Sequence, residues 1–275
     1  MDLKIFQVDA FADEVFKGNP AAVVPLESWL PDETLLAIAM ENNLSETAYI
    51  VPHEDGTAGH YYLRWFAPNA EVEICGHATL GTAYVLFEFL GISVETLAFE
   101  TRSGTLEVSR GSGGMLSMDF PAQVATDQFE NAKVLADYEA ALGAKIKNPL
   151  MRGPYSLFVL EKESDIRDVR DIRGIASALD QSPFWGLLIT APADEGREYD
   201  FISRFFAPGK GVPEDPVTGS THCMLAPYWA DRLGKNETTG YQASPRGGYV
   251  HCVVNGDRVT LSGKVAPYLK GTISI

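Results

Sequence analysis

The chain has 275 residues, a formal net charge of −15, 45% hydrophobic residues and 21% charged residues. This composition is typical of a soluble globular protein, and the length suits one large domain or two of ordinary size. The acidity and the dispersed Lys and Arg residues argue against nucleic-acid binding, because phosphate neutralisation needs clustered cations. No apolar run reaches the roughly 18 residues of a membrane-spanning helix.

The start of the chain and its cysteines predict a cytoplasmic protein. Residues 1–7 begin directly with a strand pattern and show no signal peptide. Cys75, Cys223 and Cys252 are odd in number and far apart, which predicts free thiols in a reducing compartment. The sequence has no phosphate-binding loop, dinucleotide fingerprint or zinc-type cysteine pairing. We therefore expect a protein without cofactor or metal that acts on a small molecule.

Hydrophobic patterning predicts many short strands and few helices. In the first half, strands are expected at 3–11, 21–24, 44–51, 61–66, 97–101, 105–110 and 115–120, with a helix opening at Pro31-Asp32. In the second half, strands are expected at 155–161, 184–190, 199–206, 249–254, 259–263 and 271–275, with helices at 132–142 and 165–179. Residues 53–60 and 240–248 are expected to be loops. The pattern predicts an α+β protein with a domain boundary near residue 120.

One predicted helix is apolar on every face. From Ala78 to Phe87 it carries no charged residue, so we expect it inside a core, ended by a left-handed Gly91. Cys75, Gly76 and His77 stand at its N-terminus, where unpaired N–H groups and partial positive charge favour a small anion. The alternative is a core helix that happens to begin with a cysteine and a histidine.

A short repeat gives this helix a partner. Arg64-Trp65-Phe66-Ala67-Pro68 reappears as Arg204-Phe205-Phe206-Ala207-Pro208, and each copy leads through a loop to a mainly apolar helix closed by glycine. Aligning the helices places Gly219-Ser220 opposite Gly76-His77 and Thr218 opposite Cys75. Internal duplication is the better interpretation. Duplicated domains commonly meet at a cleft, so we expect the two helix N-termini to hold a substrate carboxylate there.

Few residues stand out chemically when each is taken alone. Glu46 enters a strand through a polar corner, and Asp215 precedes a proline in ordinary turn chemistry. His77 could be a capping histidine, and Cys75 an inert thiol, although a helix N-terminus favours a thiolate. His222 and Cys223 are interpreted as packing residues of a helix. His251 and Cys252 lie on a predicted strand, and no metal-ligand spacing joins them to the others.

Five motifs together resemble the PhzF phenazine-biosynthesis family, in the right order and through nearly the whole chain. They are Gly18-Asn19-Pro20, Asn43-Leu44-Ser45-Glu46-Thr47, Phe66-Ala67-Pro68, Gly76-His77 and Glu214-Asp215-Pro216-Val217-Thr218-Gly219-Ser220. The resemblance implies the diaminopimelate epimerase-like fold: two pseudo-symmetric domains, each a β-barrel-like sheet around a central helix. We expect these at 1–120 and 121–275, with the last strand able to cross back to the first domain.

The resemblance also implies a function. It is a cofactor-independent isomerase that moves a proton within a small carboxylate, similar to trans-2,3-dihydro-3-hydroxyanthranilate isomerase. Glu46 matches the acid/base of the family, with His77 and Asp215 assisting. Gly76, Gly219 and Ser220 are expected to bind the substrate. A carboxylate serves as base and then acid most effectively when burial raises its pKa towards the working pH. A homodimer is compatible with the sequence.

Cys75 departs from the family pattern. The phenazine enzymes have a small residue there, whereas related epimerases have a catalytic cysteine at both pseudo-symmetric positions. Because the second position is Thr218, a two-thiol racemase is excluded. Two alternatives stay open: an epimerase that uses Cys75 with a carboxylate, and a small-ligand-binding protein without turnover.

Overall fold

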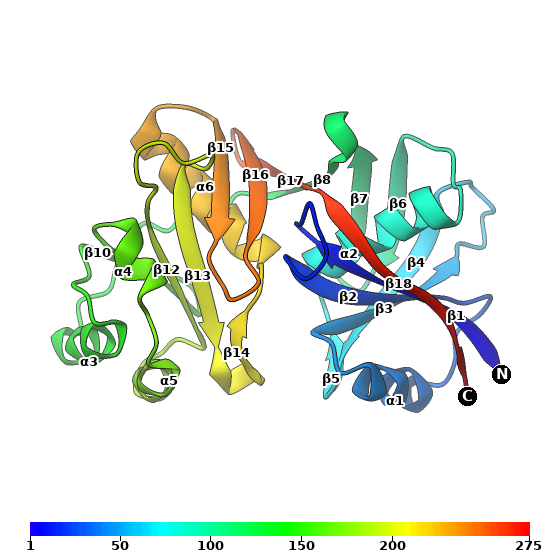
Figure 1. The fold of residues 1–275 in the computed structure, drawn as a ribbon, viewed down its shortest axis with the longest axis horizontal. Helices are drawn as coiled ribbons and strands as arrows, with labels where there is room; N and C mark the ends of the chain where they lie inside the picture. The colour runs from blue at the N-terminus through cyan, green and yellow to red at the C-terminus, as the bar shows by residue number, and fades with distance from the viewer. The chain divides into compact units, whose positions relative to one another are not determined.

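The chain divides into two compact units. The computed structural model describes residues 1–275, except for the side chain at position 210. Unit 1 comprises Met1–Asp119 and Ser262–Ile275, and unit 2 comprises Phe120–Leu261. The two chain ends lie together in unit 1, where the first strand pairs antiparallel with the last and Asp2 stands opposite Ser274 (Figure 1).

Unit 1 contains a central helix, α2 (Gly76–Tyr84), which continues as a π-helical turn at Val85–Phe89. The other elements are β1 (Asp2–Ala10), β2 (Asn19–Pro25), α1 (Asp32–Asn42), β3 (Glu46–Pro52), β4 (His60–Ala67), β5 (Ala70–Val72), β6 (Thr96–Thr101), β7 (Gly104–Arg110), β8 (Leu116–Pro121) and β18 (Val265–Ser274). Helix α2 contacts β1, β2, β3, β7 and β18. Helix α1 packs its Leu35, Ile38 and Ala39 into a separate apolar cluster with the strands.

Unit 2 repeats this plan around α6 (Gly219–Leu233). Its other elements are β9 (Asp127–Gln128), α3 (Ala132–Leu142), β10 (Asn148–Arg152), β11 (Tyr155–Val159), α4 (Glu163–Arg167), α5 (Ile172–Asp180), β12 (Gly186–Pro192), β13 (Phe201–Ala207), β14 (Val212–Asp215), β15 (Glu237–Gln242), β16 (Gly248–Asn255) and β17 (Arg258–Gly263). Met224, Leu225 and Trp229 of α6 pack against the strands, while α3 and α5 contribute to a second cluster.

Strand pairing confirms the internal repeat. In unit 1, β2 pairs parallel with β3, β3 antiparallel with β4, and β4 parallel with β6. In unit 2, β11, β12, β13 and β15 pair in the same order and the same senses. Even the register agrees, because Tyr49 faces Arg64 on β4 and Ile189 faces Arg204 on β13.

The repeated arginines have a shared structural role that sequence reasoning missed. Arg64 donates two hydrogen bonds of 2.7 Å to Glu71 on β5. Arg204 donates to Glu214 on β14 at 2.6 and 2.8 Å. In both units a bidentate pair therefore joins the strand before the central helix to the short strand that leads into it.

Several predicted elements were wrong in detail. The helix expected at 165–179 is two helices, because Asp171 starts a new one by accepting a hydrogen bond from the N–H of Gly174. The loop expected at 240–248 contains the end of β15, whose small and polar residues mask the strand pattern. The last strand begins at Val265 rather than 271. Helix α6 continues through Pro227 to Leu233.

The ends of the central helices follow the prediction. Gly91 has a φ of +69° just after the π-helical turn, and Gly234 caps α6 with a φ of +65°. The π-helical turn itself was not predicted. Within the described residues, no helix combines the length and the apolar character that a membrane crossing requires.

Candidate active site

Glu46 is the first residue of β3 and is positioned by the turn that precedes β2. Ala21 of β2 stands opposite Glu46 in the parallel pair. The side chain of Asn19, fully buried, accepts a hydrogen bond of 3.2 Å from the hydroxyl of Ser45. The Gly18-Asn19-Pro20 motif and the residue before Glu46 are therefore held together. About one fifth of the Glu46 side chain (19%) stays exposed.

Only glycine fits at position 18. Its φ is +61°, and an added Cβ would lie 2.1 Å from the carbonyl oxygen of Ala10. The turn brings the backbone carbonyl of Pro20 into a hydrogen bond with the imidazole of His77. Proline has no N–H, so the carbonyl accepts and the ring donates. The Gly18-Asn19-Pro20 motif therefore forms the turn that places the Pro20 carbonyl against His77.

Helix α2 presents Cys75 and His77 at its buried start. Cys75 is the N-cap residue, and its carbonyl accepts a 2.7 Å hydrogen bond from the hydroxyl of Thr79. Gly81 permits close packing, because an added Cβ there would lie 2.8 Å from Val8 on β1. The N–H groups of the first helical turn have no partner within the helix, so the site favours negative charge.

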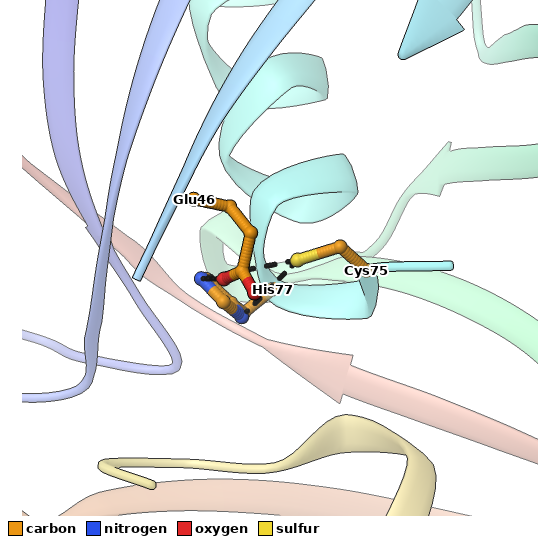
Figure 2. A group of neighbouring side chains, drawn as sticks. All are labelled: Glu46, Cys75 and His77. Carbon is orange, nitrogen blue, oxygen red and sulfur yellow. Dashed lines mark hydrogen bonds and ion pairs between the residues drawn. The ribbon is translucent and has the colours of Figure 1, made fainter. Parts of the chain in front are cut away.

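Glu46, Cys75 and His77 converge at this helix start, and we call them the α2 cluster (Figure 2). Oε2 of Glu46 lies 3.2 Å from Nε2 of His77. Sγ of Cys75 lies 3.5 Å from Nδ1 and 4.0 Å from Nε2 of the same ring. The structure thus brings together the carboxylate, imidazole and thiol that the sequence analysis selected separately.

Burial keeps His77 neutral. It lowers the pKa of the imidazole from 6.5 to about 3, although the hydrogen bond to Pro20 acts in the opposite direction. At neutral pH the ring therefore carries a single N–H. It can orient a neighbouring carboxyl group without placing a full positive charge beside it.

The corresponding part of unit 2 contains Asp215, Thr218 and Gln242, which we call the α6 cluster. The hydroxyl of Thr218 donates to Oδ2 of Asp215. The side chain of Gln242 donates to the Asp215 carbonyl at 2.9 Å and to Oγ1 of Thr218 at 3.1 Å. It also accepts from the N–H of Thr218 at 2.9 Å. Gln242, which is fully buried on β15, therefore holds the turn that begins α6.

His222 is buried behind this cluster. Its Nδ1 donates to the carbonyl of Thr218 at 2.9 Å, just as Thr79 bonds to the carbonyl of Cys75 in unit 1. Burial lowers its pKa to about 4, against the effect of the Thr218 hydrogen bond. The second nitrogen, Nε2, is buried without a hydrogen-bond partner, next to Gly240. His222 is a packing residue, as the sequence analysis expected.

The remaining predicted residues lie where the repeat put them. Gly76 and Gly219 are the first residues of α2 and α6, with Cys75 and Thr218 as their N-caps. Gly219 is buried and Ser220 is exposed. Their role in binding substrate stays a prediction. Sequence reasoning missed Gln242, because its strand was interpreted as a loop, and the Pro20 carbonyl, because backbone atoms leave no side-chain signal.

Among the side chains that the structure describes, two groups are close enough to hold a metal ion. One is the α2 cluster, and the other consists of His53, Asp55 and His60 near the β3–β4 connection. In the second group, Asp55 lies 2.8 Å from Nδ1 of His60 and 3.3 Å from Nδ1 of His53. The sequence analysis expected no metal, because the cysteines lack zinc-type spacing, and neither group depends on paired cysteines.

Comparison with known proteins assigns the fold. The PhzC-PhzF family, described as phenazine biosynthesis-like protein, matches residues 8–271. A Pseudomonas aeruginosa protein named as an uncharacterized isomerase is 47% identical over 100% of both chains. A crystal structure of a PhzF-family phenazine biosynthesis protein from Enterococcus faecalis has a TM-score of 0.89 and 40% identity, covering 100% of both chains.

A more distant structure shares the fold alone. A hydroxyproline epimerase from Agrobacterium vitis has a TM-score of 0.58 over 99% of this chain and 92% of that chain, at 12% identity. These matches confirm the predicted α+β, diaminopimelate epimerase-like fold. The chain belongs to the PhzC-PhzF family of phenazine biosynthesis-like proteins.

Proposed function

We propose that the protein is a cofactor-independent isomerase that moves a proton within a small carboxylate, with Glu46 as the proton carrier. One observation carries the proposal: Oε2 of Glu46 lies 3.2 Å from Nε2 of a buried histidine, at the N-terminus of a buried helix. A positioned carboxyl group beside an anion-binding helix start is the minimum equipment for proton abstraction next to a carboxylate.

The proton inventory of the α2 cluster supports this role. A neutral imidazole has one N–H, and His77 donates it to the carbonyl of Pro20. A ring that gives its single N–H to Pro20 has no second proton for Glu46, so His77 stays a neutral neighbour of the carboxyl group. Glu46 can then take a proton from one carbon and return it to another carbon.

The substrate is expected to carry a carboxylate. The unpaired N–H groups at the start of α2 would bind it and stabilise the charge that develops when a neighbouring C–H bond breaks. Gly76 leaves that turn without a side chain. Asp215, Gly219 and Ser220 keep the assisting and binding roles that the family resemblance implies. The closest reaction in kind is the isomerisation of trans-2,3-dihydro-3-hydroxyanthranilate.

The relatives point to the same class of reaction. Members of the family from Pseudomonas aeruginosa and Halalkalibacterium halodurans, between 42% and 47% identical to this chain over at least 99% of its length, are named as isomerases. Those names identify no substrate. Proton transfer within one molecule is the step that an isomerase without cofactor has to perform.

A thiol-based epimerase is the second candidate. Sγ of Cys75 lies 3.5 Å from His77 and shares the cluster with Glu46, so a thiol and a carboxylate could act on one carbon. The pseudo-symmetric position in unit 2 is Thr218, whose hydroxyl donates to Asp215. Within unit 1, a single thiol would therefore depend on Glu46 as its partner.

Exchange of substrate hydrogen with heavy water tests the proposal. The protein is incubated in D₂O with a panel of cyclic and α-amino carboxylates, and deuterium incorporation is followed by NMR. We expect incorporation into one class of substrate and its loss in Glu46→Gln. Glu41→Gln, an exposed carboxylate at the end of α1, is the matched control and should exchange normally.

Two results would replace the proposal. Full exchange in Glu46→Gln together with its loss in Cys75→Ala would assign the chemistry to the thiol. Ligand binding without exchange for every carboxylate tried would indicate a binding protein that retains the fold.

A further inference from the structure

The α2 cluster has the donor set of a metal site as well as that of a proton carrier. Glu46, Cys75 and His77 each offer one ligand atom, and these atoms all lie within 4.8 Å of one another. Carboxylate, thiolate and imidazole are the three donors that Zn²⁺ takes, and open zinc sites use three protein ligands. We propose that a thiophilic divalent cation of the Zn²⁺ class binds the α2 cluster and blocks the isomerase. The blocking rests on the function proposed above, whereas the binding does not.

The two separations that involve Nε2 of His77 lie near those around a tetrahedral ion. Nitrogen, oxygen and sulfur ligands at zinc distances stand about 3.3–3.6 Å from one another in that geometry. Here Oε2 of Glu46 lies 3.2 Å, and Sγ of Cys75 lies 4.0 Å, from Nε2 of His77. The third pair, the Glu46 oxygen and the Cys75 sulfur, lies within 4.8 Å, and Sγ is nearer to Nδ1, at 3.5 Å, than to Nε2. The thiol therefore has to move towards the lone pair of Nε2 before all three groups bind one ion.

The surroundings also fit a metal ligand. The backbone carbonyl of Pro20 accepts a hydrogen bond from His77, and such a partner fixes the tautomer and orientation of a metal-bound imidazole. Cys75 is the N-cap of α2, where the helix favours the thiolate that binds metal. Both side chains are buried, so few water molecules compete for the ion.

The other candidate group is less suited to an ion. The rings of His53 and His60 are stacked 3.9 Å apart with their planes only 10° from parallel. A lone pair lies in the plane of its ring, so these two rings cannot both direct one at the same ion. The group also has no thiol. A metal bound there would therefore give a different spectrum from one bound at Cys75.

Titration with Co²⁺, a spectroscopic substitute for Zn²⁺, tests the binding. The full chain is treated with a chelator, exchanged into metal-free buffer and titrated with Co²⁺ alone. We expect a thiolate-to-cobalt charge-transfer absorption with the intense visible bands of a four-coordinate ion, saturating at one ion per chain. One equivalent of Zn²⁺ should remove these bands.

Variants then locate the site. Cys75→Ser should lose the charge-transfer absorption, Glu46→Gln should weaken binding by about tenfold or more, and Cys252→Ala, at a buried thiol outside the cluster, should leave both unchanged. Circular dichroism verifies folding, and Glu46→Gln gives a second readout should Cys75→Ser fail to fold. The proposal is overturned if Co²⁺ produces no thiolate absorption, or if the absorption survives in Cys75→Ser.

The inhibitory part has its own readout. Zn²⁺ at one equivalent should abolish deuterium exchange, and a chelator should restore it. Unchanged exchange in the presence of bound Zn²⁺ would overturn the inhibition but leave the binding site. If no carboxylate undergoes exchange, the proposed function fails, and the Co²⁺ titration still decides the metal site by itself.

Discussion

The starts of α2 and α6 have the same backbone arrangement but different side chains. Each follows a strand pair closed by an Arg–Glu ion pair, and each begins with a glycine after an extended N-cap residue. By strand register, the position of Glu46 on β3 corresponds to Gly186 on β12. The proposed proton carrier therefore has no carboxylate counterpart at this position of unit 2.

The other positions at the helix starts also differ. Cys75 corresponds to Thr218, His77 to Ser220, and Thr79 to His222. The α2 cluster joins a carboxylate to an imidazole and a thiol, while the α6 cluster joins the carboxylate of Asp215 to a hydroxyl and an amide. The duplicated fold has thus kept its scaffold in both units and changed the partners of the carboxylate.

The largest effect is expected from the shared ion pairs. Arg204, buried, bonds to Glu214 and to the carbonyls of Ile166 and Val169, so Arg204→Met should destabilise the protein by about 3–5 kcal/mol. Arg64 is more exposed, so Arg64→Met should cost about 1–3 kcal/mol. Urea unfolding measures both. Equal losses would show that burial does not distinguish the two pairs.

His222 should make unit 2 sensitive to acid in a way that its counterpart Thr79 does not. Its pKa is lowered from 6.5 to about 4, so the unfolded chain takes up the proton first. Stability is therefore retained above pH 6.5 and falls as the pH drops towards 4, by up to about 3 kcal/mol. His222→Thr, which copies unit 1, should reduce this slope in unfolding curves recorded across that range, while the contribution of His77 remains. An unchanged slope would remove His222 as its cause.

Glycine substitutions in the turns before β2 and β11 are expected to cause stability losses of intermediate size. Gly18→Ala meets the Ala10 carbonyl at a φ of +61° and should cost about 2–3 kcal/mol. Gly153 has a φ of +54° but open space around it, so Gly153→Ala should cost about 1–2 kcal/mol. Thermal unfolding ranks the two. Because the first turn carries Pro20, only Gly18→Ala should also slow deuterium exchange.

The smallest effect is expected at the N-cap positions. Thr218→Val removes the hydroxyl that contacts Asp215 and Gln242, and should cost about 1–2 kcal/mol. Cys75→Ser keeps the size of the side chain and should change the free energy of unfolding by less than about 1 kcal/mol. A larger loss in Cys75→Ser would mean that the thiol has a structural role.

The sequence predicted what is local and what is repeated. The apolar run of α2, the repeated Arg-to-Pro segment and the glycine after each helix were sufficient for the two helix starts and their alignment. The selection of Glu46 and His77 as site residues came only from family resemblance, and their contact was not predicted, since the two lie on different elements. Gln242 and the Pro20 carbonyl act across the sheet, and neither periodicity nor composition indicates such contacts. The Arg–Glu pairs were missed because the short strands that carry the glutamates have no hydrophobic pattern.

The role of Glu46 is tested most directly by comparing deuterium exchange in Glu46→Gln and Cys75→Ala under identical conditions. General acid–base catalysis contributes about 10²–10⁴-fold, so Glu46→Gln should slow exchange by that factor, and Cys75→Ala by less than about tenfold. The reverse order, with Cys75→Ala inactive and Glu46→Gln close to the unmodified protein, would contradict Glu46 as the proton carrier.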